Sequence, residues 1–262
     1  MKKFWIGPAL VCAMTLSGCG GSNPETAKSE TPAAGAASGA AGGGEMPDMA
    51  NGATVTGKVA FDGAKPTMRT LDMSANPTCM KAHPTPVKSQ EVVVNDNGTL
   101  ANAFVWVKSG LPDKQWAITP TPVSLDQHGC MYEPHVIGVM TGQNIEIKNT
   151  DPTNHNIHPL PQTNQEWNES QPPGSETKTR SFARQEVMIA VKCNIHPWMR
   201  AYIGVVSHPF FAVTGADGTY TIKGLPPGTY TIESWHEKYG TKDEQITVGA
   251  KDSKTLDFSF KG

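Results

Sequence analysis

The sequence lacks an excess of either charge. It has 22 Lys and Arg residues against 24 Asp and Glu residues in 262, a formal net charge of −2. Domains that bind nucleic acid carry a basic patch, so nucleic acid is not expected as a partner. The longest apolar run, "FWIGPALVCAMTL", is shorter than the roughly 20 residues that span a bilayer. No long segment keeps a helical period either, which excludes a helical bundle.

The N-terminal run has the pattern of an export signal. Lys2 and Lys3 precede it, in the charge order of a secretory signal peptide. The run ends in "LSGC", which resembles the lipobox of bacterial lipoproteins. The resemblance implies a signal peptide over residues 1–18 and acylation of Cys19; cleavage at another nearby small residue is the alternative. We therefore expect a protein of the bacterial cell envelope, lipid-anchored in the membrane and facing the periplasm or the cell surface.

The segment that follows has nothing to bury. Residues 20–51 contain no aromatic and no branched aliphatic side chain. Such a composition cannot form a core, so residues 19–52 are predicted to be a flexible tether. The square-root scaling of a Gly-rich chain gives it a typical reach of roughly 30 Å. This reach suits docking to several partners, although a spacer that only clears the membrane surface is equally consistent.

The rest of the chain shows mostly the two-residue repeat that is typical of β-strands. Polar and apolar residues alternate, and Asn-Gly, Asp-Gly and Pro-Pro-Gly turns separate the alternating segments. Residues 161–184 are polar and contain proline, which predicts a long loop with at most a short helix. The fold class is therefore predicted to be all-β, with one or two antiparallel sandwiches. The alternating segments are 54–61, 102–108, 144–149, 219–224 and 229–234, with apolar runs at 91–94, 136–139 and 202–206.

Three of the five cysteines belong to the folded part. Cys79 and Cys130 lie in loop-like contexts, whereas Cys193 lies next to His196 and Met199. In an oxidising compartment two cysteines are expected to pair, and we predict a disulfide between Cys79 and Cys130. The alternative is a second metal site without recognisable ligand spacing, formed by Cys130 with His128, His135 or His83.

The third thiol falls in a pattern of soft ligands. Cys193, His196 and Met199 are spaced three residues apart in "CNIHPWM". A buried free cysteine is common as a small apolar residue, but thiolate, imidazole and thioether together suit copper. A trigonal copper site also needs a second imidazole. The segment after the strand at 144–149 offers His155 and His158.

These two motifs resemble those of the small blue-copper proteins of the cupredoxin superfamily, of the plastocyanin and amicyanin kind. The resemblance covers roughly residues 92–206 and implies a Greek-key β-sandwich. It also implies one type 1 copper with the ligands His155, Cys193, His196 and Met199. A core position is the alternative for Met199, and another weak axial group would then replace it. His158 is expected to point away from the metal.

The resemblance assigns roles to the neighbouring residues as well. Asn156 is expected to brace the His155 loop against the Cys193 loop. His196, with Pro197 and Trp198 beside it, is expected to be the site at the surface through which electrons enter and leave. The alternative for Trp198 is a structural role, in which its ring packs over the copper. Extra His-x-His pairs, a His-Cys-His element and a second cysteine in the loop are all absent from the sequence, which excludes multicopper oxidase and binuclear sites.

The resulting hypothesis is a carrier of single electrons and not an enzyme, so no catalytic residue is expected. Its redox donor and acceptor would be proteins such as a cytochrome, a dehydrogenase or a membrane respiratory complex, met across small, weak interfaces. The competing hypothesis is a lipoprotein that binds copper without redox function, or that attaches to surfaces or carbohydrate.

The C-terminal part has a different character. Its "GLPPGTY" turn, with flanking strands, resembles the carboxypeptidase regulatory-like, transthyretin-like β modules. We expect a copper domain over residues 53–206 with an N-terminal strand extension, followed by this module over residues 207–262. The segment "TVTGKVAF" also resembles the first strand of such a module, so an alternative is that the copper domain is inserted into it.

Overall fold

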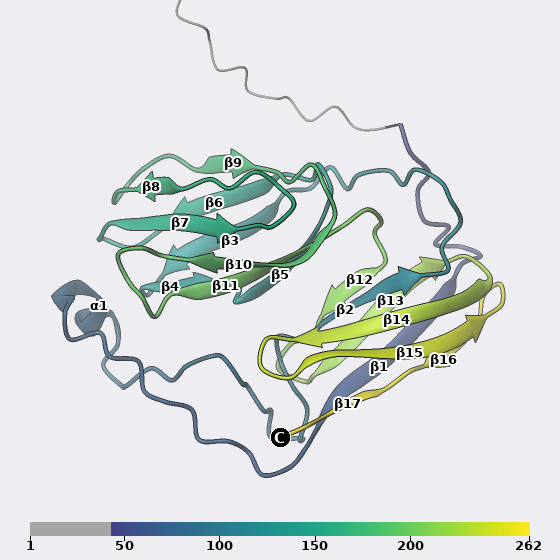
Figure 1. Ribbon diagram of the computed structural model, residues 1–262, viewed down its shortest axis with the longest axis horizontal. Coiled ribbons are helices and arrows are strands. Elements are labelled where there is room, and N and C mark those ends of the chain that lie inside the picture. Colours follow the sequence, from purple (N-terminus) through teal and green to yellow (C-terminus); the bar gives the residue numbers. More distant parts are fainter. Residues whose placement is uncertain (1–42) are drawn as a thin grey trace, which may run out of the picture. The chain divides into compact units, whose positions relative to one another are not determined.

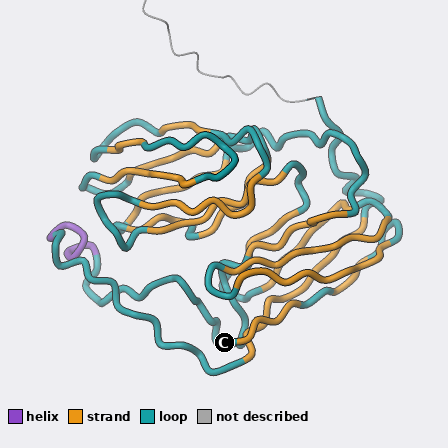
Figure 2. Tube along the Cα trace, in the orientation of Figure 1, coloured by secondary structure: helices purple, strands orange, loops and turns teal. Residues whose placement is uncertain are grey.

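The computed structural model describes residues 43–262 (Figure 1). The predicted signal peptide, Cys19 and tether residues 19–42 lie outside the described residues. The described part contains seventeen strands and one short helix, the single purple segment of Figure 2. This composition confirms the predicted all-β fold class. No helix among residues 43–262 has both the length and the apolar character needed to cross a membrane.

Nine strands form the first sandwich. One sheet has the order β5-β11-β10-β7-β8 and the other the order β4-β3-β6-β9. Their inward side chains form a continuous apolar core that includes Leu125, Ile147 and Ile203. The strands are β3 (Val123–His128), β4 (Met131–Glu133), β5 (Val136–Met140), β6 (Ile145–Asn149), β7 (His155–Leu160), β8 (Glu169–Gln171), β9 (Lys178–Arg180), β10 (Glu186–Lys192) and β11 (Arg200–Val206).

The register of this sandwich brings distant motifs to one end of a sheet. β7 and β10 are antiparallel neighbours, with Lys192 opposite His158. The start of β7 and the end of β10 are therefore close together, although about 40 residues separate them. The β10–β11 hairpin returns the chain beside β5, to which β11 runs parallel. The loop after β10 thus lies beside the residues that begin β7.

The second sandwich combines chain segments from both sides of the first, as the mixed colours in Figure 1 show. β1 pairs with β13, β16 and β17, and β2 pairs with β12 and β14. Residues 53–62 and 104–109 are thus in the same sheets as strands of residues 211–261. The strands are β1 (Ala53–Asp62), β2 (Phe104–Ser109), β12 (Phe211–Val213), β13 (Thr219–Leu225), β14 (Gly228–His236), β15 (Gly240–Val248), β16 (Ser253–Thr255) and β17 (Phe258–Lys261).

Two glycines allow close contact where β2 meets β5 and β11. A Cβ atom added at Gly138 or at Gly204 would lie 2.7 Å from the ring of Phe104. Real Cβ atoms do not approach that closely, so any side chain at these positions would push the ring away. The ring of Phe104 therefore packs directly on the strand backbone of the first sandwich.

Some segments differ from the sequence-based expectations. Residues 91–94 form only an isolated bridge between Val94 and Leu100 instead of a strand. The predicted loop at 161–184 includes the short strands β8 and β9. The helix, α1 (Pro77–Ala82), lies outside that loop. It begins at Asn76, whose side-chain oxygen accepts hydrogen bonds from the amides of Thr78 and Cys79.

The last residues of the predicted tether are ordered by hydrogen bonds, and part of them pairs with the segment that follows β2. The amide of Glu45 donates to the carbonyl of Gln115, and the amide of Ala117 donates to the carbonyl of Glu45. Asp48 accepts hydrogen bonds from the amides of Ala50 and Asn51 and so fixes a turn. Composition alone did not indicate this, because backbone pairing and a capped turn need no apolar side chain.

Two histidines outside the first sandwich, His208 and His236, are buried. His208 donates from Nε2 to the carbonyl of Val107, and its Nδ1 accepts from the amide of Phe210. Burial lowers the pKa of His208 to about 4, and burial also lowers the pKa of His236 to about 4. Both rings are therefore neutral in the folded protein at neutral pH.

We predict that acid destabilises the fold before the carboxylates titrate. Unfolding returns each ring to an ordinary pKa near 6.5, so between about pH 6.5 and pH 4 the unfolded chain binds more protons. The free energy of unfolding should fall by about 1.4 kcal/mol per pH unit for each such histidine. Urea unfolding from pH 7 to pH 4.5 measures this slope. His208→Gln, which retains a donor but cannot titrate, should give a shallower slope; an unchanged slope would contradict the assignment.

Candidate metal centre

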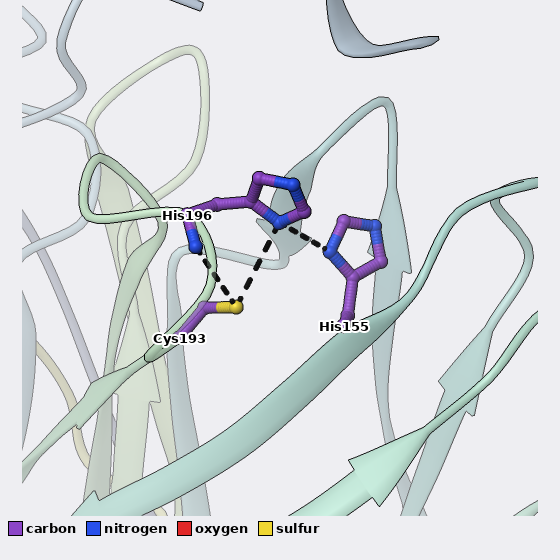
Figure 3. Close-up of side chains that lie close together, drawn as sticks. All are labelled: His155, Cys193 and His196. Atoms are coloured by element: carbon purple, nitrogen blue, oxygen red, sulfur yellow. Dashed lines mark hydrogen bonds between the residues drawn. The ribbon is translucent and has the colours of Figure 1, made fainter. Parts of the chain in front are cut away.

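Three side chains converge at the end of the first sandwich (Figure 3). His155 begins β7, Cys193 follows β10, and His196 lies in the loop between β10 and β11. The Nδ1 atoms of the two histidines are 2.9 Å apart, and the Cys193 Sγ is 3.8 Å from the His196 Nδ1. One ligand atom from each residue lies within 4.8 Å of the others. The three residues are 0%, 3% and 1% exposed.

The loop itself directs the sulfur towards the rings. The amide of Met199 donates to the carbonyl of His196, and the amide of Cys193 donates to the carbonyl of Met199. The amide of His196 also donates to the Cys193 Sγ, at 3.4 Å. These contacts close residues 193–199 into a tight turn. A thiolate in this turn is stabilised before any metal arrives.

The side chain of Asn156 connects the two loops. Its Oδ1 accepts hydrogen bonds from the Cys193 Sγ at 3.3 Å and from the amide of Asn194 at 2.7 Å. Its Nδ2 donates to the Oδ1 of Asn168. Contacts of this kind orient metal ligands and limit their movement when the oxidation state changes.

Asp151 holds the ring of His155. Its Oδ2 is 2.8 Å from the His155 Nε2, and its carboxylate accepts from the amides of Gly129 and Cys130, each at 2.7 Å. Burial alone would raise the pKa of Asp151, but these hydrogen bonds outweigh burial and lower it. An ionised Asp151 accepts the proton of Nε2, which leaves the lone pair of Nδ1 for a metal.

Sequence reasoning missed Asp151. The available signal was its spacing, because a carboxylate four residues before a ligating histidine can accept the second ring proton. Burial would lower the pKa of His155, but hydrogen bonds with Asp151 and Cys193 raise it. Burial would raise the pKa of Cys193, but hydrogen bonds, first from His155, lower it and favour the thiolate.

The prediction that His196 forms a surface port for electrons is wrong, because another segment of the chain covers the imidazole ring of His196. The His196 Nε2 is 2.7 Å from the Nδ2 of Asn76 and 3.6 Å from the Sγ of Cys79. Burial, followed by the charge of His155, lowers the pKa of His196 to about 4. Trp198 is also buried, whereas Pro197 is exposed. The His196 edge that would meet a partner therefore faces protein.

We name residues 70–88, which form this cover, the cap loop. Its ends are joined by the bridge between Thr70 and Lys88 and by the hydrogen bond from the amide of Leu71 to the carbonyl of Val87. Its middle carries α1 and Cys79. Cys79 is disulfide-bonded to Cys130, the pairing that the sequence predicted. The disulfide attaches the cap loop to the first sandwich.

The contact with Asn76 determines which nitrogen of the His196 ring carries the proton. The Oδ1 of Asn76 is occupied by the amides that it caps, so its Nδ2 donates to the His196 Nε2. Ligation of a metal through Nδ1 requires a proton on Nε2 instead. That proton would find an acceptor in the sulfur of Cys79 and not in Asn76. Metal binding therefore requires a small shift of Asn76.

The other candidate residues do not belong to this cluster of three, although Cys130 has its sulfur within 4.8 Å of ligand atoms of Asp151 and His155. His158 contacts Asn194 and Glu166 and is not part of the cluster of three. Among residues 43–262, His83, His128 and His135 contribute to no metal-like cluster, and Cys130 is bonded to Cys79. Met199 is fully buried in the same apolar core as Cys193 and Trp198.

Comparisons with known proteins give matches of limited extent. The family model of the carboxypeptidase regulatory-like domain matches residues 200–261. The comparison with curated proteins found no match. Solved structures with a similar fold include the copper-containing nitrite reductase of Thermus scotoductus SA-01, at 21% identity and a TM-score of 0.31. That match covers 37% of this chain and 25% of the reductase chain.

Two smaller proteins match over almost their whole length. A Cu(I) structure of an amicyanin mutant shares 18% identity, covering 40% of this chain and 98% of amicyanin, with a TM-score of 0.29. The purple cupredoxin of Nitrosopumilus maritimus shares 17% identity, covering 32% of this chain and 98% of that chain, with a TM-score of 0.27. This chain is thus similar to cupredoxins in one part and to carboxypeptidase regulatory-like domains in another.

Proposed function

We propose that this protein is a mononuclear copper protein that carries single electrons outside the cytoplasm and does not catalyse a reaction. The observation that carries the proposal is the convergence of two histidine Nδ1 atoms and the Cys193 Sγ in one buried site. A set of one thiolate and two imidazoles is the trigonal arrangement of blue-copper sites. Bound there, copper would supply a reversible change between Cu(II) and Cu(I).

The protein's own residues perform the remaining tasks. Asp151 orients His155, and Asn156 joins the two ligand loops, so the ligand atoms stay in place in both oxidation states. Burial excludes water from the site. Met199 is proposed as the weak axial ligand, because it ends the same tight loop and is fully buried.

Copper titration of the purified protein tests the proposal. One equivalent of Cu(II) should produce an intense visible band from thiolate-to-copper charge transfer, and a reductant should bleach it reversibly. His158→Gln is the matched control, since this histidine lies on the same strand outside the cluster. A protein that binds copper without colour, or whose colour does not respond to reductant, would favour the non-redox hypothesis.

Replacement of Met199 by Leu should change the redox potential more than the copper content. Loss of an axial donor destabilises Cu(II) more than Cu(I), so the potential should rise. A shift of about 60 mV corresponds to a tenfold change in relative affinity for the two oxidation states, and we expect at least this much. Voltammetry and metal analysis of the same sample measure the two effects. A parallel loss of copper and colour, with no change in potential, would show that Met199 is only a core residue.

Anchoring through Cys19 is part of the proposal, supported by the "LSGC" sequence after an apolar run. Metabolic labelling with a radioactive fatty acid should mark the protein and should fail for Cys19→Ala. An unlabelled protein that is still exported would show an ordinary signal peptide.

A further inference from the structure

A cavity of about 340 Å³ lies beside the metal centre. Its lining includes Trp198, Arg200, Tyr202, Arg69 and Glu237. This volume is in the range of pockets that hold small molecules and is too small for a folded partner. Neither the fold nor the proposed metal site accounts for it.

The two arginines of this cavity stand apart from its carboxylates. Glu91 is paired with Lys238 at 3.3 Å, and Glu237 is 3.2 Å from the Nε2 of His135. Arg69 and Arg200 form no ion pair and no side-chain hydrogen bond with any residue of the described part. The two guanidinium groups are therefore the charged groups of this lining that are left without a partner. Guanidinium groups bind carboxylates and similar planar anions through paired hydrogen bonds.

The cavity also reaches the metal ligands through one aromatic side chain. The ring centroids of Trp198 and His196 are 5.1 Å apart, and Trp198 lines the cavity. The indole Nε1 donates to the carbonyl of Cys130, which fixes the ring. The cap loop covers the Nε2 of His196. Trp198 therefore connects the His196 ring to a cavity that a small molecule can enter.

We propose that a small organic anion that is a one-electron reductant docks at Arg69 and Arg200 in this cavity. It passes one electron through Trp198 and His196 to the metal centre. With copper bound, the donor would lose one electron, and its acidic proton to solvent where it carries one, and become a radical, while Cu(II) would be reduced to Cu(I). This proposal rests on the proposed function and names the class of the electron donor.

Binding is tested first on the metal-free protein, with ascorbate under anaerobic conditions as the probe. Ascorbate should shift the indole N–H signal of Trp198 in NMR spectra, with assignment from a Trp198→Phe sample. Arg69→Gln combined with Arg200→Gln should abolish the shift. Arg184→Gln, which removes an exposed arginine outside the cavity, should retain it. No shift in the wild type, or an equal loss in the Arg184 control, would overturn the proposal.

Stopped-flow reduction of the copper-loaded protein tests the electron route. The rate with ascorbate should saturate, and the double arginine variant should be slowed about tenfold or more, as expected for the loss of one strong contact. Reduction by neutral hydroquinone should not change in that variant. Trp198→Leu should lower the saturating rate while the half-saturating concentration is kept. Linear kinetics, or equal slowing with both donors in the arginine variant, would overturn the proposal.

The two proposals fail in different ways. If the metal-free protein binds ascorbate through both arginines but no blue band forms with copper, the cavity is a binding site and the electron-carrier function is wrong. If the blue band forms and ascorbate does not bind, the function stands and the small-anion donor is wrong.

Discussion

Cys193→Ser should eliminate the visible colour of the copper-loaded protein completely. The band requires a sulfur-to-copper bond, and among residues 43–262 the only other cysteines are joined in the disulfide. A serine hydroxyl is not deprotonated at neutral pH and is a hard ligand, so affinity for Cu(I) should fall by much more than affinity for Cu(II). Visible absorption and competition with a Cu(I) chelator measure the two effects.

The fold itself should tolerate this substitution, which makes the result specific. Serine has nearly the shape of cysteine, and the hydrogen bonds of Cys193 with Asn156 and His196 can be kept by an oxygen. The unfolding transition of the metal-free variant should stay close to that of the wild type. Colour that survives in Cys193→Ser would disprove a blue-copper site.

The second large effect concerns the disulfide of the cap loop. Cys79→Ser combined with Cys130→Ser opens a loop of sequence separation 51. The chain-entropy relation for a loop of that length gives a loss of roughly 4 kcal/mol in the free energy of unfolding. Denaturant unfolding of the double variant against the wild type measures it. A loss of less than about 1 kcal/mol would show that the loop stays ordered without its cross-link.

The same variant should also expose the metal centre. With the cap loop released, the His196 Nε2 loses its contact with Cys79 and becomes accessible to external reagents. Reduction by neutral hydroquinone should become faster than in the wild type. Asn76→Ala is the matched control: it removes the helix cap and the second contact to His196 but leaves the disulfide, at a stability cost of about 1 kcal/mol. An unchanged rate in both variants would mean that the cap loop does not limit access.

The strand pattern and the ligand spacing were readable from the sequence because both are local. Alternation of apolar residues predicted the bounds of β1, β6, β13 and β14 to within two residues. The spacing of Cys193, His196 and Met199 fits a tight hairpin loop, and the structure closes that loop with backbone hydrogen bonds. His155 is close to this loop because of the register between β7 and β10.

The features that were missed depend on contacts between distant segments. The cover over His196 arises from Asn76 and Cys79, about 120 residues earlier in the chain, and neither has a local pattern that indicates this contact. The sheet partners of β1 lie about 160 or more residues later. Likewise, only the folded chain shows that Arg69 and Arg200 line one cavity.

The pairing of β1 determines how the protein would respond to mechanical load. Tension arriving from the N-terminal side meets the backbone hydrogen bonds of Glu45 and then β1, which is hydrogen-bonded antiparallel to β13 and parallel to β16 and β17. A pull along this strand shears several rows of hydrogen bonds at once, and none of them belongs to the sheets that carry His155 and Cys193. The ligand geometry is thereby insulated from forces on the chain's N-terminal end.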